Sequence, residues 1–374
     1  MVTRKILLCA TDAGGAGNIV PLLNVLDRKG FQSILAITKP LNTLFKVNVF
    51  GTESISAGSI TSEKMAFHIL EKIKPFAVIC GTTRYIGAER FLTLAAKIFS
   101  IRSVVVLDEW FNYHLRFQDE NGNLFYLPDI ICCQDQQAKK EAEAEGIPSQ
   151  LLNVTGSPYL SNLTDKAQQF AINEPEIPDF IKSYVNEQIV TFLSETHTSD
   201  YGSASGKQGP LGSFIGYTEH SVKNEVITVL KRLNRQIVFI EKLHPGAEGL
   251  DFQVSKQGKI TLIRIKQTDL WKLLYYSDVV LGMRSMALLE SCILGRPTVS
   301  YQPGLIGPQL CTAVRLGIIS CLSQSSKLED WLRQKMNITI VEKEKLSVKR
   351  YPFAASDAVE RIAKLAIEGM VSSN

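Results

Sequence analysis

The sequence has no long hydrophobic run and no concentration of charge of one sign. No apolar stretch approaches the roughly 20 residues that a membrane-spanning helix requires. The formal net charge is only +4 over 374 residues. No block of Lys and Arg with interleaved aromatic residues occurs, as an RNA-binding protein would need. We therefore expect a soluble globular protein without a membrane span or a nucleic-acid partner. Peripheral association with a membrane stays open.

Metal-binding and disulfide patterns are also lacking. Seven cysteines is an odd number, and the adjacent pair Cys132-Cys133 does not have the C-x-x-C spacing of a redox or zinc site. Apolar surroundings predict reduced, buried thiols in a cytoplasmic protein. The chain starts with basic residues and an apolar run of about six residues that ends at Asp12. This run is too short for a secretory signal and lacks a cleavage site, so we predict that it forms the first strand.

What is present is an alternation of strand-like and helix-like segments. Near-continuous apolar strands separated by helices predict an α/β fold, with a parallel sheet that helices cover on both faces. In the first half, strands are expected at 5–12, 31–38, 76–82, 102–110, 128–134 and 151–156.

The pattern stops between 162 and 178, where polar residues surround Pro175 and Pro178, and then a second strand–helix series begins. The length also exceeds what one core usually holds, so two domains are expected. We predict an N-terminal domain over 1–165 and a C-terminal domain over 180–350. An amphipathic helix within 351–374 is expected to pack back toward the N-terminal domain.

A glycine-rich loop follows the first predicted strand and opens a helix. Glycine permits a tight turn and a close approach of backbone to ligand. The loop is not G-x-G-x-x-G, and no acidic residue ends the second strand, which disfavours a nicotinamide dinucleotide site. A ligand-binding loop and a turn without a ligand both stay possible. Its residues of interest are Asp12, Gly14, Gly15, Gly17 and Asn18.

Chemically active side chains are concentrated in 108–117, directly after an apolar strand. Ligands bind α/β sheets at the carboxyl ends of the strands. An aromatic ring offers a stacking face to a sugar, and a carboxylate can act as a general base. We interpret the run as a site for a polar, ring-shaped substrate, with a structural loop packed under the domain as the alternative. The residues are Asp108, Glu109, Trp110, Asn112, His114 and Arg116.

In the second half, 277–304 predicts a strand, a turn at Gly282, a helix to about residue 294 and another strand. The backbone N–H groups at such a helix start suit a phosphate. Glu290 on the helix can accept two ribose hydroxyls, or it is an ordinary half-exposed glutamate. His244 ends another strand, where it can donate to a phosphate or sugar oxygen or serve only in a turn. The segment 196–218 predicts an irregular, mobile loop without an assigned function.

Together these segments resemble the GT-B superfamily, which covers nucleotide-sugar glycosyltransferases and UDP-N-acetylglucosamine 2-epimerases. The first loop is similar to the acceptor-side loop of the transferases, but Asn18 stands where many members have a catalytic histidine. The strand ends at 80–83 and 107–109 are similar in placement to those that carry acids in the epimerases, with Gly81-Thr82 in place of the first acid. Segment 154–158 resembles the end of the N-terminal domain in this superfamily, and segment 243–245 resembles a strand end that carries a histidine. Segment 282–297 resembles the donor-binding segment.

The resemblance implies two Rossmann-like domains that face each other across a cleft, with the nucleotide on the C-terminal one. It implies a glycosyltransferase that moves a sugar from a nucleotide-diphosphate sugar, UDP-linked, to a hydroxyl acceptor in polysaccharide or glycoconjugate biosynthesis. A nucleotide-sugar 2-epimerase or hydrolase of the same fold, and a non-catalytic nucleotide-sugar-binding subunit, are the alternatives. No D-x-D pair is evident, so no obligatory metal and no cofactor are expected.

The implied catalytic residues are Asp12, Asp108, Glu109 and His244. The implied donor-binding residues are Arg284, Ser285, Met286, Glu290 and again His244. The implied acceptor-side residues are Gly14, Gly15, Gly17, Asn18, Trp110, Asn112, His114 and Arg116.

Overall fold

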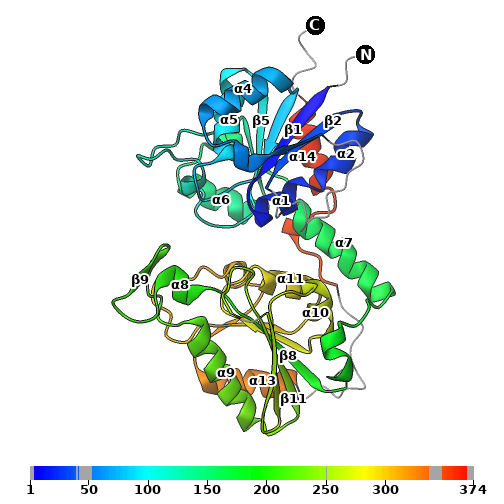
Figure 1. Cartoon of the computed structure of the whole chain (residues 1–374), viewed down its shortest axis with the longest axis vertical. Coiled ribbons are helices and arrows are strands. Elements are labelled where there is room, and N and C mark those ends of the chain that lie inside the picture. The colour runs from blue at the N-terminus through cyan, green and yellow to red at the C-terminus, as the bar shows by residue number, and fades with distance from the viewer. Residues whose placement is uncertain are drawn as a thin grey trace. The chain divides into compact units, whose positions relative to one another are not determined.

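The computed structural model describes residues 4–38, 41, 53–184, 186–249, 251–336 and 348–368. The chain divides into two compact units (Figure 1). The first unit is Met1–Leu163 together with Arg350–Asn374, and the second is Thr164–Lys349. Helix α7 (Pro158–Ile172) carries the chain from one unit to the next.

The first unit is built on seven parallel strands in the order β3-β2-β1-β4-β5-β6-β7. The order reverses at β1, which has β2 on one side and β4 on the other. A crevice therefore opens at the carboxyl ends of β1 and β4, where ligands of such sheets bind. The strands are β1 (Lys5–Ala10), β2 (Gln32–Ile37), β3 (Glu53–Ser56), β4 (Ala77–Cys80), β5 (Arg102–Val106), β6 (Ile130–Cys133) and β7 (Leu152–Val154).

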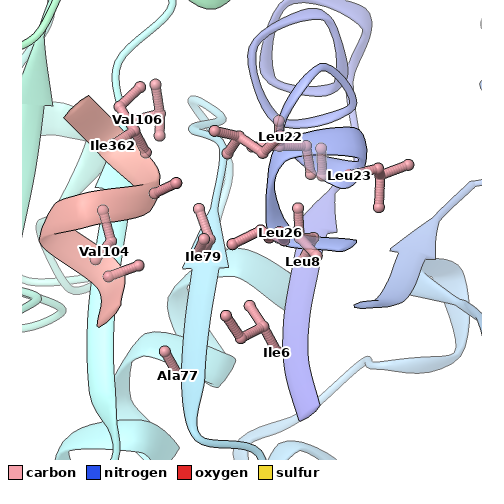
Figure 2. Packing of buried hydrophobic residues seen from close by; sticks show 14 of the residues in the cluster. Ile6, Leu8, Leu22, Leu23, Leu26, Ala77, Ile79, Val104, Val106 and Ile362 are labelled. Carbon is pink, nitrogen blue, oxygen red and sulfur yellow. The ribbon is translucent and has the colours of Figure 1, made fainter. Parts of the chain in front are cut away.

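Helices cover both faces of this sheet, which is why β1 is buried along nearly its whole length. On one face, Ile6 and Leu8 pack with Leu22 and Leu26 in a single apolar cluster. Figure 2 shows that Ile362, close to the end of the chain, joins the same cluster beside the strands. The helices are α1 (Ala13–Ile19), α2 (Leu22–Arg28), α4 (Glu63–Ile73), α5 (Ala88–Ile98), α6 (Gln136–Ala144) and α14 (Ala358–Ile367).

The second unit repeats the plan with the order β12-β13-β11-β8-β14-β15-β16. Its reversal lies at β8, between β11 and β14, so the carboxyl ends of β8 and β14 form the corresponding edge. The strands are β8 (Gln188–Leu193), β11 (Ile237–Lys242), β12 (Phe252–Gln257), β13 (Ile260–Ile265), β14 (Val279–Gly282), β15 (Thr298–Tyr301) and β16 (Cys321–Leu322). The helices are α8 (His197–Tyr201), α9 (Glu219–Arg232), α10 (Leu270–Tyr276), α11 (Ala287–Ile293), α12 (Thr312–Arg315) and α13 (Ser325–Lys335).

The predicted fold class, α/β with two Rossmann-like sheets, is confirmed. Two local expectations are wrong. Strand β12 pairs antiparallel with β13, whereas only parallel strands were expected. All six residues of β12 are exposed, and it lacks the continuous apolar run on which the other strands were predicted. The segment expected to be irregular, 196–218, contains α8 and a small hairpin of β9 (Gln208–Gly209) and β10 (Gly212–Ser213).

All seven cysteines are free, and six of them are buried. Among the described residues, every helix is too short or too polar to cross a membrane.

Candidate functional site

Two glycines bring the turn after β1 against the neighbouring strand ends. A Cβ atom on Gly81 would lie 2.6 Å from the Cα atom of Gly15, and one on Gly14 would lie 2.3 Å from an oxygen of Asp108. Both distances are far below van der Waals contact, so a side chain would force the elements apart. Helix α1 therefore begins immediately above the ends of β4 and β5, where the sequence predicts only a loop.

This edge of the first unit holds a cavity of about 830 Å³, a size typical of small-molecule sites. Three of the predicted catalytic carboxylates, Asp12, Asp108 and Glu109, line it. The remaining walls combine threonine hydroxyls, two guanidinium groups and apolar side chains. The lining is completed by Thr11, Gly14, Thr38, Ala57, Gly58, Ile60, Thr61, Thr83, Arg84, Tyr85, Ile86, Gly87, Ala88, Phe91 and Arg116.

Two of the three carboxylates are neutralised by arginine. The buried guanidinium of Arg116 donates from Nη1 to Asp108 at 2.8 Å and from Nη2 to Glu109 at 2.7 Å. Thr82 donates its hydroxyl proton to Asp108 at 2.5 Å. Arg84 lies 3.4 Å from Glu109. Both carboxylates are thus fixed in geometry and paired in charge.

The surroundings of the Asp12 carboxyl group differ from those of Asp108 and Glu109. Its side chain accepts a hydrogen bond from the Gly15 N–H at 2.8 Å and so begins helix α1. Burial, followed by the negative charge of Asp108, raises the pKa of Asp12 to about 7, although the Gly15 N–H and the charge of Arg116 act in the opposite direction. A carboxylate that titrates near neutral pH at the wall of a cavity is suited to general acid–base work.

Glu89 of α5, which the sequence analysis missed, does not line the cavity but bonds to Thr11, which does. Glu89 is 3% exposed, and its Oε1 accepts hydrogen bonds from both the backbone N–H and the hydroxyl of Thr11, each at 2.6 Å. Its Oε2 is buried without a hydrogen-bond partner among the described residues. Burial raises the pKa of Glu89. The only signal in the sequence was its spacing from Thr93 and Ala96, which places it on the buried face of α5.

Trp110 and His114 do not line the cavity, so the 108–117 run is only partly a site. Trp110 is 1% exposed, donates to Asp135 at 2.9 Å and meets Phe353 edge-on at 5.6 Å. It therefore offers no stacking face, which corrects the sequence-based expectation. Both ring nitrogens of His114 contact carbonyl oxygens, at 2.8 and 3.0 Å, and these contacts raise its pKa.

Asn112 is also outside the cavity lining. It is exposed in a left-handed turn with φ 58°. The run therefore contributes Asp108, Glu109 and Arg116 to the cavity, while Trp110 and His114 bond to other parts of the first unit.

Asn18 is structural as well. It is 3% exposed, donates to the Gly14 carbonyl at 3.1 Å and accepts from the Ser157 hydroxyl at 2.8 Å. Gly17 lies against Tyr159, whose ring would be 2.9 Å from an added Cβ atom. These contacts attach α1 to the start of α7. The acceptor-side role predicted for Asn18 has no support here, because its side chain is committed inside the domain.

In the second unit, the carboxyl edge at the reversal of strand order brings Arg284 beside Glu195, which lies two residues after the end of β8. The Arg284 N–H donates to both oxygens of Glu195, at 3.1 and 3.2 Å, and Arg284 Nε donates to His197 Nε2 at 2.9 Å. The ring of Tyr201 lies 4.4 Å from the guanidinium. The turn in which we predict a diphosphate is therefore in contact with a carboxylate of the same chain.

Burial controls the charge of both residues that follow β8. It raises the pKa of Glu195 to about 7 and lowers that of His197 to about 3, the latter helped by the charge of Arg284. The sequence analysis identified His244 because it follows the carboxyl end of a strand, but it did not identify Glu195 or His197. Both also follow the carboxyl end of a strand, where ligands of such sheets bind.

The remaining donor-side candidates lie on the same edge. Helix α11 begins at Ala287 and not directly after Gly282, and Ser285 Oγ accepts from the Ala287 N–H at 3.2 Å. Glu290 is 6% exposed and accepts from Trp271 Nε1 at 2.7 Å, so it is not a half-exposed glutamate.

His244 is exposed, and its Nδ1 accepts from the Gly246 N–H at 3.1 Å. The donor-binding roles of Arg284, Ser285, Met286, Glu290 and His244 stay predictions.

Within the part of the chain that the structure describes, no group of three or more His, Cys, Asp or Glu side chains is arranged to hold a metal ion.

No protein family and no curated protein sequence matches the chain, but solved structures do. A UDP-GlcNAc 2-epimerase from Methanocaldococcus jannaschii superimposes with a TM-score of 0.64 at 14% identity, over 98% of this chain and 100% of that one. The Neisseria meningitidis UDP-GlcNAc 2-epimerase bound to UDP-GlcNAc gives the same values. The glycotransferase of kitacinnamycin gives 0.55 at 12% identity, over 98% and 95%. At these identities the comparison establishes the fold, which is the GT-B-like fold that the sequence predicts.

Proposed function

We propose that the chain is a glycosyltransferase that moves a sugar from a UDP-sugar to a hydroxyl acceptor in polysaccharide or glycoconjugate biosynthesis. The observation that carries the proposal is the state of Asp12 in the cavity of the first unit. It lines the cavity, its pKa is raised to about 7, and its carboxylate has no arginine partner in hydrogen-bond contact among the described residues. The fold adds support, since structures that share it are described with UDP-GlcNAc or UDP bound.

In this mechanism the acceptor hydroxyl lies in the cavity and Asp12 removes its proton as the oxygen attacks the anomeric carbon of the donor. The bond between that carbon and the diphosphate breaks, and UDP leaves with the electron pair. Arg284 and His244 are the candidates to stabilise the charge that develops on the diphosphate. Asp108 and Glu109 serve as hydrogen-bonding and positioning groups, since Arg116 is bonded to both and Arg84 also lies against Glu109.

The proposal is tested with Asp12→Asn. General-base catalysis contributes about 100- to 10,000-fold to a rate, so we expect kcat of sugar transfer to fall by that range. The wild-type rate should rise with pH through about 7, because the base acts only when deprotonated, and the variant should lose this rise. Asp27→Asn, a charge removal on α2 far from the cavity lining, is the matched control. Wild-type activity in Asp12→Asn would reject the assignment.

A nucleotide-sugar 2-epimerase is the second candidate, because UDP-GlcNAc 2-epimerases predominate among the similar structures. Inverting carbon 2 requires that its C–H bond be broken, so an epimerase exchanges that hydrogen with solvent. UDP-GlcNAc incubated with the chain in D₂O without acceptor distinguishes the two. Deuterium at carbon 2 favours the epimerase, and an intact donor favours the transferase.

Free sugar in that experiment indicates a hydrolase. UDP binding by calorimetry without turnover across a panel of donors and acceptors indicates a non-catalytic subunit.

A further inference from the structure

One wall of the cavity in the first unit is apolar and carries an unusually exposed aromatic ring. Tyr85 lies in the connection between β4 and α5, lines the cavity and is 71% exposed. Its backbone N–H donates to the Thr83 hydroxyl at 3.3 Å, which holds the turn that presents the ring. Ile86 and Phe91 line the same cavity. Together these three side chains supply the apolar surface of the cavity on which a ring can pack.

The rest of the lining is rich in hydroxyl and carboxylate oxygens. Thr11, Thr38 and Thr61 line the cavity together with Asp12. A pyranose ring has an apolar C–H face and a rim of hydroxyl groups. Its face matches a tyrosine ring. Its rim matches threonine hydroxyls, which accept and donate hydrogen bonds, and carboxylates, which accept them.

The charges of the lining select against an acidic sugar. Its cations are Arg84 and Arg116. Arg116 is paired with Asp108 and Glu109, and Arg84 lies against Glu109 and over the ring of Phe111, 5.5 Å from its centroid. Asp12 adds a further acidic group. An anionic substituent would meet carboxylates and two arginines that are already paired, so it would be desolvated without a partner.

We propose that this cavity binds an uncharged saccharide whose ring stacks on Tyr85, and that it excludes acidic saccharides. The inference rests on the proposed function in that it names the class of acceptor for the same site. Tyr85 then takes the stacking role that the sequence suggested for Trp110.

The test measures binding to the full chain by saturation-transfer NMR and calorimetry, with UDP present. The probes are lactose, cellobiose, maltose and chitobiose, and their acidic counterparts are 3′-sialyllactose and digalacturonic acid. We expect at least one uncharged probe to bind and both acidic probes to bind about tenfold more weakly or not at all. Tyr85→Ala should weaken the uncharged probe about tenfold, whereas Tyr85→Phe should retain binding within about threefold, because the ring face remains.

Phe125→Ala is the matched control, since this ring is 47% exposed but does not line the cavity, and it should bind as the wild type does. No binding of any uncharged probe, equal binding of the acidic probes, or unchanged binding by Tyr85→Ala would each overturn the inference. Turnover of UDP-GlcNAc is measured separately. Saccharide binding without sugar transfer would reject the proposed function and leave this inference standing. Sugar transfer by a protein whose saccharide binding does not depend on Tyr85 would reject this inference and support the proposed function.

Discussion

Asp12, Asp108 and Glu109 line one cavity but differ in what surrounds each carboxyl group. Asp108 and Glu109 each accept from Arg116, which offsets their charge and fixes their geometry. Asp12 accepts a single backbone hydrogen bond. Burial therefore dominates its titration, and its pKa rises to about 7. Under the proposed function, we infer that Asp12 transfers the proton and that the other two carboxylates position the substrate, a division that rests on neighbours and not on residue type.

The variant Glu89→Gln tests whether the charge of Glu89 raises the pKa of Asp12. The charge of Glu89 raises the pKa of Asp12, as does that of Asp108, while Arg116 and the Gly15 N–H lower it. Removing the Glu89 charge should move the acid limb of the kcat/KM–pH profile to lower pH. The glutamine Oε1 still accepts from Thr11, so the maximal rate should stay within a few fold.

A purely structural role for Glu89 would lower the rate and leave the acid limb in place. Glu89→Ala, which removes the acceptor for Thr11 altogether, is the comparison. If the acid limb of the kcat/KM–pH profile does not move in Glu89→Gln, Glu89 does not raise the pKa of Asp12.

At the scale of secondary structure, the site depends on how closely α1 approaches β4. Gly15 in the first turn of α1 faces Gly81 immediately after β4, and neither has a side chain to separate the backbones. The two segments are far apart in sequence, and each is unremarkable alone. Their contact sets the position of the turn at Asp12 relative to Asp108, and so it determines the shape of the cavity floor.

Gly81→Ala should destabilise the first unit. Its Cβ atom would lie 2.6 Å from a backbone atom of Gly15, which cannot move without shifting α1. Overpacking of this kind costs about 1–3 kcal/mol, so the urea midpoint should fall and activity with it. Gly58→Ala is the control for the urea midpoint alone, because Gly58 itself lines the cavity. Its added Cβ atom would lie 3.7 Å from its nearest neighbour, a side-chain oxygen. An unchanged midpoint in Gly81→Ala would show that the approach of the two backbones is not limiting.

At the scale of the whole molecule, the first unit is assembled from both ends of the chain. Helix α14 places Ile362, Ala363 and Ala366 in the same apolar cluster as β1 and β4. The second unit is one continuous stretch with clusters of its own. The first unit therefore cannot complete its core until the second has been synthesised, whereas the second has no such dependence.

Ile362→Ala should destabilise one unit and spare the other. The side chain is fully buried, and such a truncation costs about 2–5 kcal/mol. Amide hydrogen exchange should accelerate in β1, β4 and β5 and stay unchanged in β8 and β11. Lys364→Ala, at an exposed position of the same helix, should leave exchange unchanged in both units. Equal acceleration in both units would mean that they unfold together.

The sequence by itself determined the architecture and the edge of each sheet that carries chemistry. Strands that are covered on both faces must be apolar throughout, so they can be recognised from the sequence. In a parallel sheet, the side chains that follow these strands lie at the carboxyl edge. Asp12, Asp108, Arg284 and His244 were selected as candidates in this way.

Only the tertiary structure decided which of those side chains face a cavity and in which charge state. The contact of Glu89 with Thr11 spans 78 positions, and that of Glu195 with Arg284 spans 89. Trp110 and Asn18 are likewise committed to partners from other elements. Burial and hydrogen-bond partnership depend on such distant neighbours, and a local pattern of residues does not contain them.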